Sequence, residues 1–152
     1  MNYTGFVDYY DKIYDSQGKD YGSEVRRLHG LVQRLKLTTG RRLLDVGCGT
    51  GVHLRHMKAF FEVGGLDSSG EMLRVTSKKL PGIPLHRADM RDFSLDRAFD
   101  VITCLFGSIG FVESVRGLGK AVGNMSRHLA WAVFFSFSLC WGRRTWEMEG
   151  CI

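Results

Sequence analysis

Apolar positions in this chain follow two spacings, which predict alternating helices and strands. After Gly22 apolar residues recur every three or four positions among arginines, so residues 6–36 are predicted to be helical, up to a stop at Gly40. Compact apolar runs predict buried strands at residues 42–46 and 61–66, around Leu85, and at residues 99–105. The helical spacing returns between the strands, at residues 54–57, 72–75 and 112–129.

The order of these elements defines the fold class. Ser68 and Glu71 have the spacing of a capping box, which predicts that the helix after the second strand starts there. A near-continuous apolar run at residues 131–140 fits a fifth strand. Because strands and helices alternate without a long linker or a repeat, we expect an α/β fold: a doubly wound, mostly parallel sheet with helices on both faces.

The length and composition set bounds on this picture. The chain has 152 residues, of which 44% are hydrophobic, enough for a single domain with a core and too apolar for a disordered chain. We expect one domain over residues 1–152, with an N-terminal helical cap, a core and an atypical apolar tail, at residues 1–40, 41–129 and 130–152. No window reaches the roughly 20 apolar residues of a membrane span, and the first residues do not resemble a signal peptide. A cytoplasmic protein without membrane contact is therefore expected.

Charge and cysteine content exclude some functions. The net charge of +5 comes from scattered Lys and Arg, so it permits an anionic ligand without predicting nucleic-acid binding. The cysteines form no CxxC pair, and His53, His56 and His86 have no metal-ligand spacing with carboxylates. We therefore expect free thiols, no metal site, and histidines that are solvated or packed rather than ligands.

The loop that follows the first strand is the main candidate site. In doubly wound sheets, ligands bind at the carboxyl ends of the strands, and this turn cradles phosphate or nucleoside groups. The loop reads Gly-Cys-Gly-Thr-Gly at residues 47–51. Val52 and His53 replace the Lys-Ser/Thr pair of a nucleotide-triphosphate loop, and Val52 stands where a dinucleotide fingerprint requires its third Gly. Of the ligand classes considered, a nucleoside remains. Val52 also disfavours a nicotinamide oxidoreductase.

Acidic residues end the predicted strands that surround this loop. Asp67 stands about 20 residues after Gly47, where a carboxylate can accept hydrogen bonds from both ribose hydroxyls. Asp89 ends the third strand and is followed by Met90, a pair suited to the amino group and the ring of adenine. Two plainer interpretations stay open: Asp45 caps the glycine loop, and Asp89 pairs with Arg91.

Together these residues resemble the class I S-adenosylmethionine-dependent methyltransferases. The stretch Leu44–Gly51 is similar to their first motif, and Asp67 and Asp89 fall where their ribose and adenine contacts lie. More narrowly, the chain looks like the N,N-dimethyltransferases that act on nucleotide-linked amino sugars, through residues 18–21, 53–54, 85–86, 89–93 and 108–110. The resemblance covers roughly residues 3–129. It implies a Rossmann-like fold and S-adenosylmethionine as the cofactor.

The resemblance also implies roles for individual residues. Cofactor contacts are expected from Tyr10, Tyr21, Asp45, Gly47, Cys48, Gly49, Asp67, Ser68, Asp89, Met90 and Leu105. Tyr3 falls near a substrate-side tyrosine and is the one catalytic candidate. Phe111 departs from the family pattern, in which His or Tyr often follows Ser-Ile-Gly, and it has no group that exchanges a proton.

The expected activity is methyl transfer to a small-molecule amine such as an amino sugar. Methyltransferases of this fold that modify bases in nucleic acids usually carry an Asn/Asp-Pro-Pro-aromatic run after the fourth strand, but Leu105–Ser108 stands there without proline. The alternative is a truncated S-adenosylmethionine-binding module or interaction protein without turnover.

The tail departs from the resemblance. The family continues beyond residue 152 with a Pro-Gly-Gly turn, a fifth strand and an antiparallel strand pair, and the turn is absent after Leu129. A reading frame shifted by two bases at Trp131 permits such a turn and strand. We therefore expect a gene truncated or frameshifted after about residue 129, without the C-terminal antiparallel strands; a genuine apolar strand is the alternative. An edge strand left there favours a homodimer through the sheet edge.

Overall fold

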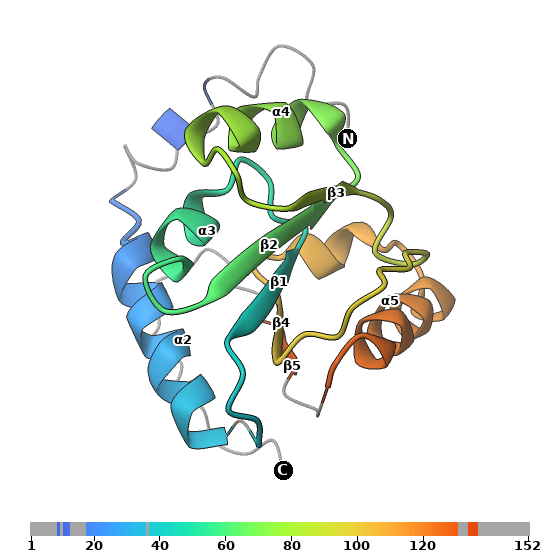
Figure 1. Ribbon diagram of the computed structural model, residues 1–152. Coiled ribbons are helices and arrows are strands. Elements are labelled where there is room, and N and C mark those ends of the chain that lie inside the picture. Colours follow the sequence, from blue (N-terminus) through green and yellow to red (C-terminus); the bar gives the residue numbers. More distant parts are fainter. Residues whose placement is uncertain (1–8, 10, 13–17, 36, 131–133, 137–152) are drawn as a thin grey trace.

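A computed structural model describes residues 9, 11, 12, 18–35 and 37–130, and the backbone of residues 134–136. In this part of the chain the strands form one sheet in the order β3-β2-β1-β4-β5, and every pairing between them is parallel (Figure 1). The strands are β1 Arg42–Val46, β2 Glu62–Asp67, β3 Leu85–Arg87, β4 Val101–Cys104 and β5 Phe134–Ser136. The helices are α2 Tyr21–Leu35, α3 Val52–Met57, α4 Gly70–Lys79, the 3₁₀ helix η1 Ser108–Phe111 and α5 Val115–Arg127. The expected doubly wound parallel sheet is confirmed.

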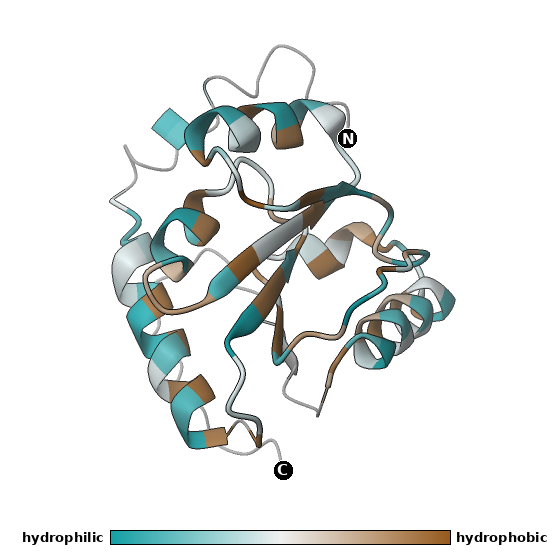
Figure 2. Cartoon of the chain, in the orientation of Figure 1, coloured by the Kyte–Doolittle hydropathy of each residue, from teal (hydrophilic) through white to brown (hydrophobic). Residues whose placement is uncertain are grey.

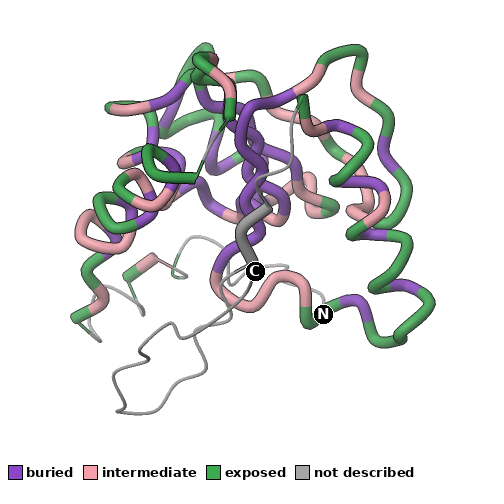
Figure 3. Tube along the Cα trace, turned by 90° about the horizontal axis from the view of Figure 1, so that it is seen from below, coloured by how far each residue is buried: buried purple, intermediate pink, exposed green. Residues whose placement is uncertain are grey.

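Strand β1 lies at the centre of the sheet and separates two apolar cores. Its adjacent residues Leu43 and Leu44 are both fully buried but belong to different cores, because successive side chains of a strand point to opposite faces. Leu43 packs in the core that α2, α3 and α4 cover, and Leu44 packs in the core beneath α5. Figure 1 shows these helices on the two sides of the sheet, and Figures 2 and 3 show the apolar, buried strands between them. Burial on both faces explains why the strands read as short apolar runs.

The predicted helix over residues 6–36 is wrong at residues 18–20, which form a turn and an irregular segment before α2. Gly18 has a φ of 71°, a left-handed conformation that ends regular helix. The carboxylate of Asp20 then accepts a hydrogen bond of 2.9 Å from the Ser23 amide, which satisfies a free donor at the start of α2.

The start of α4 also differs by one residue from the prediction. Ser69, rather than Ser68, is the N-cap, and its hydroxyl accepts a hydrogen bond from the Met72 amide. Ser68 lies instead at the edge of the cavity described below. The predicted spacing to Glu71 therefore does not produce a capping box.

Helix α5 leaves part of its predicted apolar row exposed and buries small and polar residues beside Met125. Val115 is 88% exposed and Leu118 is 43% exposed, although both follow the helical spacing. The residues it buries are Gly117, Ala121, Asn124 and Met125. In the described part of the chain, no helix is long and apolar enough to cross a bilayer.

Candidate cofactor site

Two adjoining cavities open at the carboxyl ends of the parallel strands. The first, of about 290 Å³, is lined by the loops after β1, β2 and β3 and by η1 and the residues that follow it. The second, of about 150 Å³, lies between the loop after β1, the start of α2 and the loop after β4. The residues shared by both cavities are Gly47, Gly49, Ser108 and Phe111. The two cavities therefore meet at the glycine loop, and together they are called the groove below.

Gly47 and Gly49 of the glycine loop both have positive φ, but they differ in what surrounds them. Gly47 has a φ of 74°, and a Cβ there would lie 2.6 Å from the Cβ of Ser108. The Ser108 hydroxyl in turn donates a hydrogen bond of 3.1 Å to the Gly47 carbonyl. At Gly49, with a φ of 55°, a Cβ would meet no protein atom within 4 Å. Gly47 is therefore packed against the protein, while Gly49 presents bare backbone to open space, as close approach by a ligand requires.

Asp67 ties the glycine loop to the end of β2. Its Oδ2 accepts a hydrogen bond of 2.9 Å from the Gly49 amide, and its Oδ1 accepts one of 2.8 Å from the Ser69 amide. A carboxylate offers about four acceptor positions, so these two bonds leave acceptor capacity at the wall of the first cavity. Two backbone amides thus fix the orientation of the Asp67 carboxylate beside the groove.

Asp89 and Arg91 form an ion pair at the other end of the first cavity. The Arg91 backbone amide and Nε donate to Asp89 Oδ1, at 2.8 and 2.9 Å, and Arg91 Nη2 lies 2.5 Å from Oδ2. These hydrogen bonds hold the pKa of Asp89 below its ordinary value. The pairing interpretation of Asp89 is confirmed, yet both residues, with Met90, also line the cavity.

Asp45 lies beneath the loop and is almost fully buried. Its Oδ1 accepts a hydrogen bond of 2.7 Å from the Thr103 hydroxyl on β4, and within the described residues it does not bond the amides of the glycine loop. The interpretation of Asp45 as a cap of that loop is therefore wrong. Burial raises the pKa of Asp45 to about 6, although the nearby His53 and the Thr103 bond act in the opposite direction.

A charged and aromatic cluster surrounds His53, Tyr21 and Phe106, which line the second cavity. His53 Nε2 lies 3.0 Å from Glu24 Oε2, and Lys19 Nζ lies 3.5 Å from Glu24 Oε1. Burial alone would raise the pKa of Glu24, but its hydrogen bond with His53 and the charge of Lys19 outweigh burial and lower it. The His53 ring also meets the buried Tyr21 ring edge-on at 5.0 Å, and Lys19 Nζ lies 3.5 Å above the ring of Phe106.

Sequence reasoning missed two residues here: His53, which lines the second cavity, and Glu24, which pairs with it. His53 is packed, as expected, but it is packed as part of a cavity wall. The signal was available at His53, which stands two residues after the glycine loop at the start of a helix. For Glu24 there was none, because its pairing with His53 joins residues 29 apart in the chain.

The predicted cofactor residues that the structure describes all line the groove. The first cavity holds Asp67, Ser68, Asp89 and Met90, and the second holds Tyr21, Asp45, Cys48 and Leu105. Gly47 and Gly49 belong to both. Tyr3 and Tyr10 lie outside the described residues. Within those residues, no cluster of His, Cys, Asp or Glu could hold a metal ion.

Comparison with known proteins places this groove in a family. Residues 43–131 match the family described as "Methyltransferase domain". Over 124 residues the chain is 42% identical to a dTDP-3-amino-3,4,6-trideoxy-alpha-D-glucopyranose N,N-dimethyltransferase of Streptomyces venezuelae, which covers 81% of this chain and 52% of that protein. A dTDP-3-amino-3,6-dideoxy-alpha-D-glucopyranose N,N-dimethyltransferase of Streptomyces fradiae is 41% identical over 84% of this chain and 51% of its own. The chain spans about half the length of the curated relatives it matches.

Solved structures of methyltransferases support the same family assignment. An amino pentose methyltransferase from Micromonospora echinaspora, CalS10, solved with bound S-adenosylmethionine, superposes with a TM-score of 0.81 at 36% identity. The match covers 91% of this chain and 59% of CalS10. DesVI of Streptomyces venezuelae gives a TM-score of 0.77 at 41% identity, over 82% of this chain and 52% of its own. The chain therefore belongs to the methyltransferase domain family, with the Rossmann-like fold of its class I members.

Proposed function

We propose that this chain binds S-adenosylmethionine along the groove and belongs to a methyltransferase that methylates the amine of a small molecule. The observation that carries the proposal is the pairing of Asp67 with Gly49. One residue offers a fixed carboxylate to a ribose, and the other leaves open space against bare backbone. A nucleoside with an attached amino-acid chain fits this arrangement, because the two cavities meet at the glycine loop.

The residues divide between the parts of the cofactor. Asp67 and Ser68 would hold the ribose. Met90 and the apolar residues Leu66, Met72 and Val112 of the same cavity would contact the adenine ring, with Asp89 near its amino group. The second cavity would hold the methionine part, with Gly47 and Leu105 along it and Tyr21 at its wall. The imidazole of His53, which lines the same cavity, is suited to the carboxylate of that part.

The protein's share of the chemistry is positioning. Bound S-adenosylmethionine supplies a methyl group that is already electrophilic. The groove would fix the acceptor relative to that methyl group and exclude water. Phe111, which lines both cavities, gives shape but no base, so an amine must arrive neutral or lose its proton elsewhere. Tyr3, the catalytic candidate, remains a proposal outside the described residues.

The acceptor class is proposed from the relatives. The two sugar N,N-dimethyltransferases from Streptomyces are named for dTDP-linked amino sugars, and CalS10 is described as an amino pentose methyltransferase. We propose the same class here: the free amine of a nucleotide-linked amino sugar, rather than a nucleic acid.

A methyl-transfer assay tests this function. S-adenosylmethionine with a radioactive methyl group is incubated with the chain and dTDP-3-amino-3,6-dideoxy-glucose, and the sugar lacking dTDP serves as the control acceptor. The proposal predicts label on the dTDP-sugar amine and much less on the free sugar. Cofactor binding without transfer to any amine would favour the alternative of a binding module without turnover.

Three further features belong to the proposal. Residues 1–152 would form one domain, with residues 41–129 as its cofactor-binding core. Strand β5 lies at one edge of the described sheet. Pairing of two β5 edges would give a homodimer. Light scattering during size-exclusion chromatography measures the mass that distinguishes monomer from dimer. The cytoplasm is the proposed compartment, since Cys48 and Cys104 are free, buried thiols.

A further inference from the structure

The outer side of the glycine loop carries a second set of contacts. Thr50 lies between Gly49 and Gly51, and glycine restricts the backbone least of all residues, so the loop depends on outside contacts to hold one conformation. Thr50 is only 2% exposed, and it lines the second cavity. A buried hydroxyl needs a partner, because leaving it unbonded costs free energy. What fixes Thr50 therefore affects the loop that faces the ligand groove.

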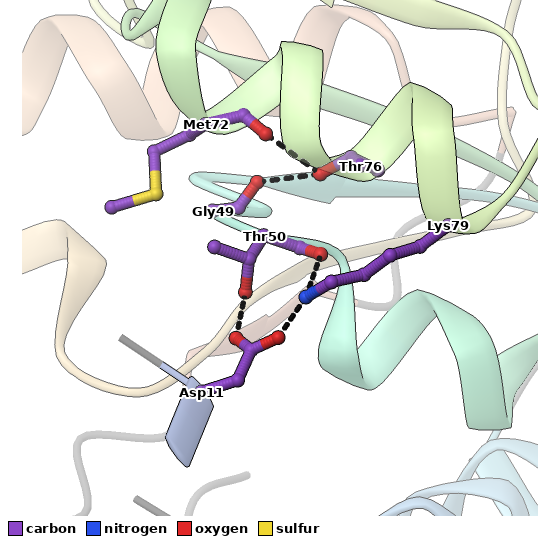
Figure 4. Close-up of polar contacts among 6 residues, drawn as sticks. All are labelled: Asp11, Gly49, Thr50, Met72, Thr76 and Lys79. Carbon is purple, nitrogen blue, oxygen red and sulfur yellow. Dashed lines mark hydrogen bonds and ion pairs between the residues drawn. The ribbon is translucent and has the colours of Figure 1, made fainter. Parts of the chain in front are cut away.

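Two side chains of helix α4 contact backbone carbonyls of this loop. The Thr76 hydroxyl donates a hydrogen bond of 2.8 Å to the Gly49 carbonyl, and its oxygen lies 3.1 Å from the Met72 carbonyl. One turn later, Lys79 Nζ lies 3.4 Å from the Thr50 carbonyl. Figure 4 shows Thr76 and Lys79 reaching from the same helix to successive residues of the loop.

Asp11 completes the set from the N-terminal part of the chain. Its Oδ1 accepts a hydrogen bond from the Thr50 hydroxyl, and its Oδ2 pairs with Lys79 Nζ (Figure 4). The Asp11 and Lys79 side chains are only 23% and 35% exposed, and partial burial strengthens such a pair relative to one in open water. Burial also lowers the pKa of Lys79, although the carboxylate beside it favours the charged form.

We propose that Asp11 is a positioning residue for cofactor binding, acting through Thr50 and Lys79 on the glycine loop. Asp67 and Thr76 hold Gly49 from β2 and α4, and the Asp11–Lys79 pair holds Thr50. Asp11 contacts the loop on the hydroxyl side of Thr50, so it orders the loop without being part of the groove. The effect on affinity rests on the proposed function, but the effect on the loop does not.

Hydrogen exchange of the free protein tests the effect on the loop. Peptides covering residues 47–57 are compared in the wild type, Asp11→Asn, Lys79→Met, Lys79→Arg and Lys78→Met, where Lys78 is an exposed neighbour on the same helix. We expect about two- to fivefold faster exchange in Asp11→Asn and Lys79→Met. Lys78→Met should match the wild type, and Lys79→Arg should recover most of the protection. Equal exchange in all five proteins would overturn the proposal.

Titration with S-adenosylhomocysteine tests the consequence for binding. The Kd should rise about two- to fivefold in Asp11→Asn and in Lys79→Met, and no further in the double variant, because both substitutions break one pair. Fully additive losses would show that the two residues act separately and would contradict the proposal. A wild-type chain that binds no S-adenosylhomocysteine would refute the proposed function, while the exchange experiment would still decide the role of Asp11.

Discussion

The Gly49 amide and the Asp67 carboxylate, 18 residues apart in the chain, are joined by a hydrogen bond of 2.9 Å across the ends of two neighbouring strands. The bond orients the carboxylate and the glycine loop relative to each other before any ligand arrives. Preorganisation of this kind reduces the entropy that binding must overcome.

Replacing Asp67 by Ala should weaken binding of S-adenosylhomocysteine by roughly 1.5–3 kcal/mol, since hydrogen bonds to charged groups are worth about that much. Calorimetric titration measures the change. Asp96→Ala is the matched control, because Asp96 is an exposed carboxylate outside both cavities. Equal affinity of the Asp67 and Asp96 variants would place the ribose elsewhere.

Gly47→Ala should destabilise the fold more than Gly107→Ala. Gly47 and Gly107 have φ values of 74° and 73°, so both variants bear the left-handed penalty of about 1–2 kcal/mol. Only at Gly47 does the new Cβ clash with Ser108, which adds about 1–3 kcal/mol of overpacking. Urea unfolding gives both free energies. Equal losses would mean that Ser108 moves aside without cost.

Asp45→Asn should remove a pH dependence of stability. The pKa of Asp45 is raised from 3.8 to about 6 by burial, so the folded state binds its proton more tightly than the unfolded state does. The wild type therefore loses stability as the pH rises from 3.8 to about 6, by at most about 3 kcal/mol, and does not regain it above that range.

Asn carries no charge and still accepts the Thr103 hydrogen bond. The variant should therefore become more stable relative to the wild type, by free energy of unfolding, as the pH rises from 4 to 7. Urea unfolding at the two pH values measures it. Parallel pH profiles for the two proteins would show that Asp45 does not titrate in this window.

Phe111→His should raise the rate of amine methylation if the chain transfers methyl groups. The imidazole would stand at a position that lines both cavities and could take the proton of an ammonium acceptor, for an expected gain of about tenfold or more. Phe111→Leu controls for the loss of the ring. The gain should follow the ionisation of His in a kcat–pH profile, and identical rates for the two variants would rule out a base at this position.

The strands and the acidic residues at their ends were predictable from the sequence for a physical reason. A strand buried on both faces is mostly apolar, as Leu43 and Leu44 show in β1, and the acidic Asp67 marks the carboxyl end of β2. Asp67 and Gly49 meet because neighbouring parallel strands end at the same edge of the sheet. The groove therefore follows from local pattern and fold class together.

Other contacts had no local signal. Asp11 and Lys79 are 68 residues apart, and the charge pattern alone offers many equivalent partners for each. The helical spacing predicted the buried face of α5 only in part: Met125 is buried as expected, but Val115 is exposed, and the buried face also includes Gly117, Ala121 and Asn124. Asn124 donates a hydrogen bond of 3.4 Å to the Met90 carbonyl, a contact between residues 34 apart that the spacing does not show.

The most direct test of the central claim is the response of individual backbone amides to S-adenosylhomocysteine in ¹⁵N-labelled protein. Binding in the groove predicts saturable shifts at Gly47, Gly49, Asp67 and Met90, with little change at Arg42 and Glu62, the first residues of β1 and β2 at the other end of the sheet. No shifts at saturating ligand, or shifts confined to that other end, would contradict the account.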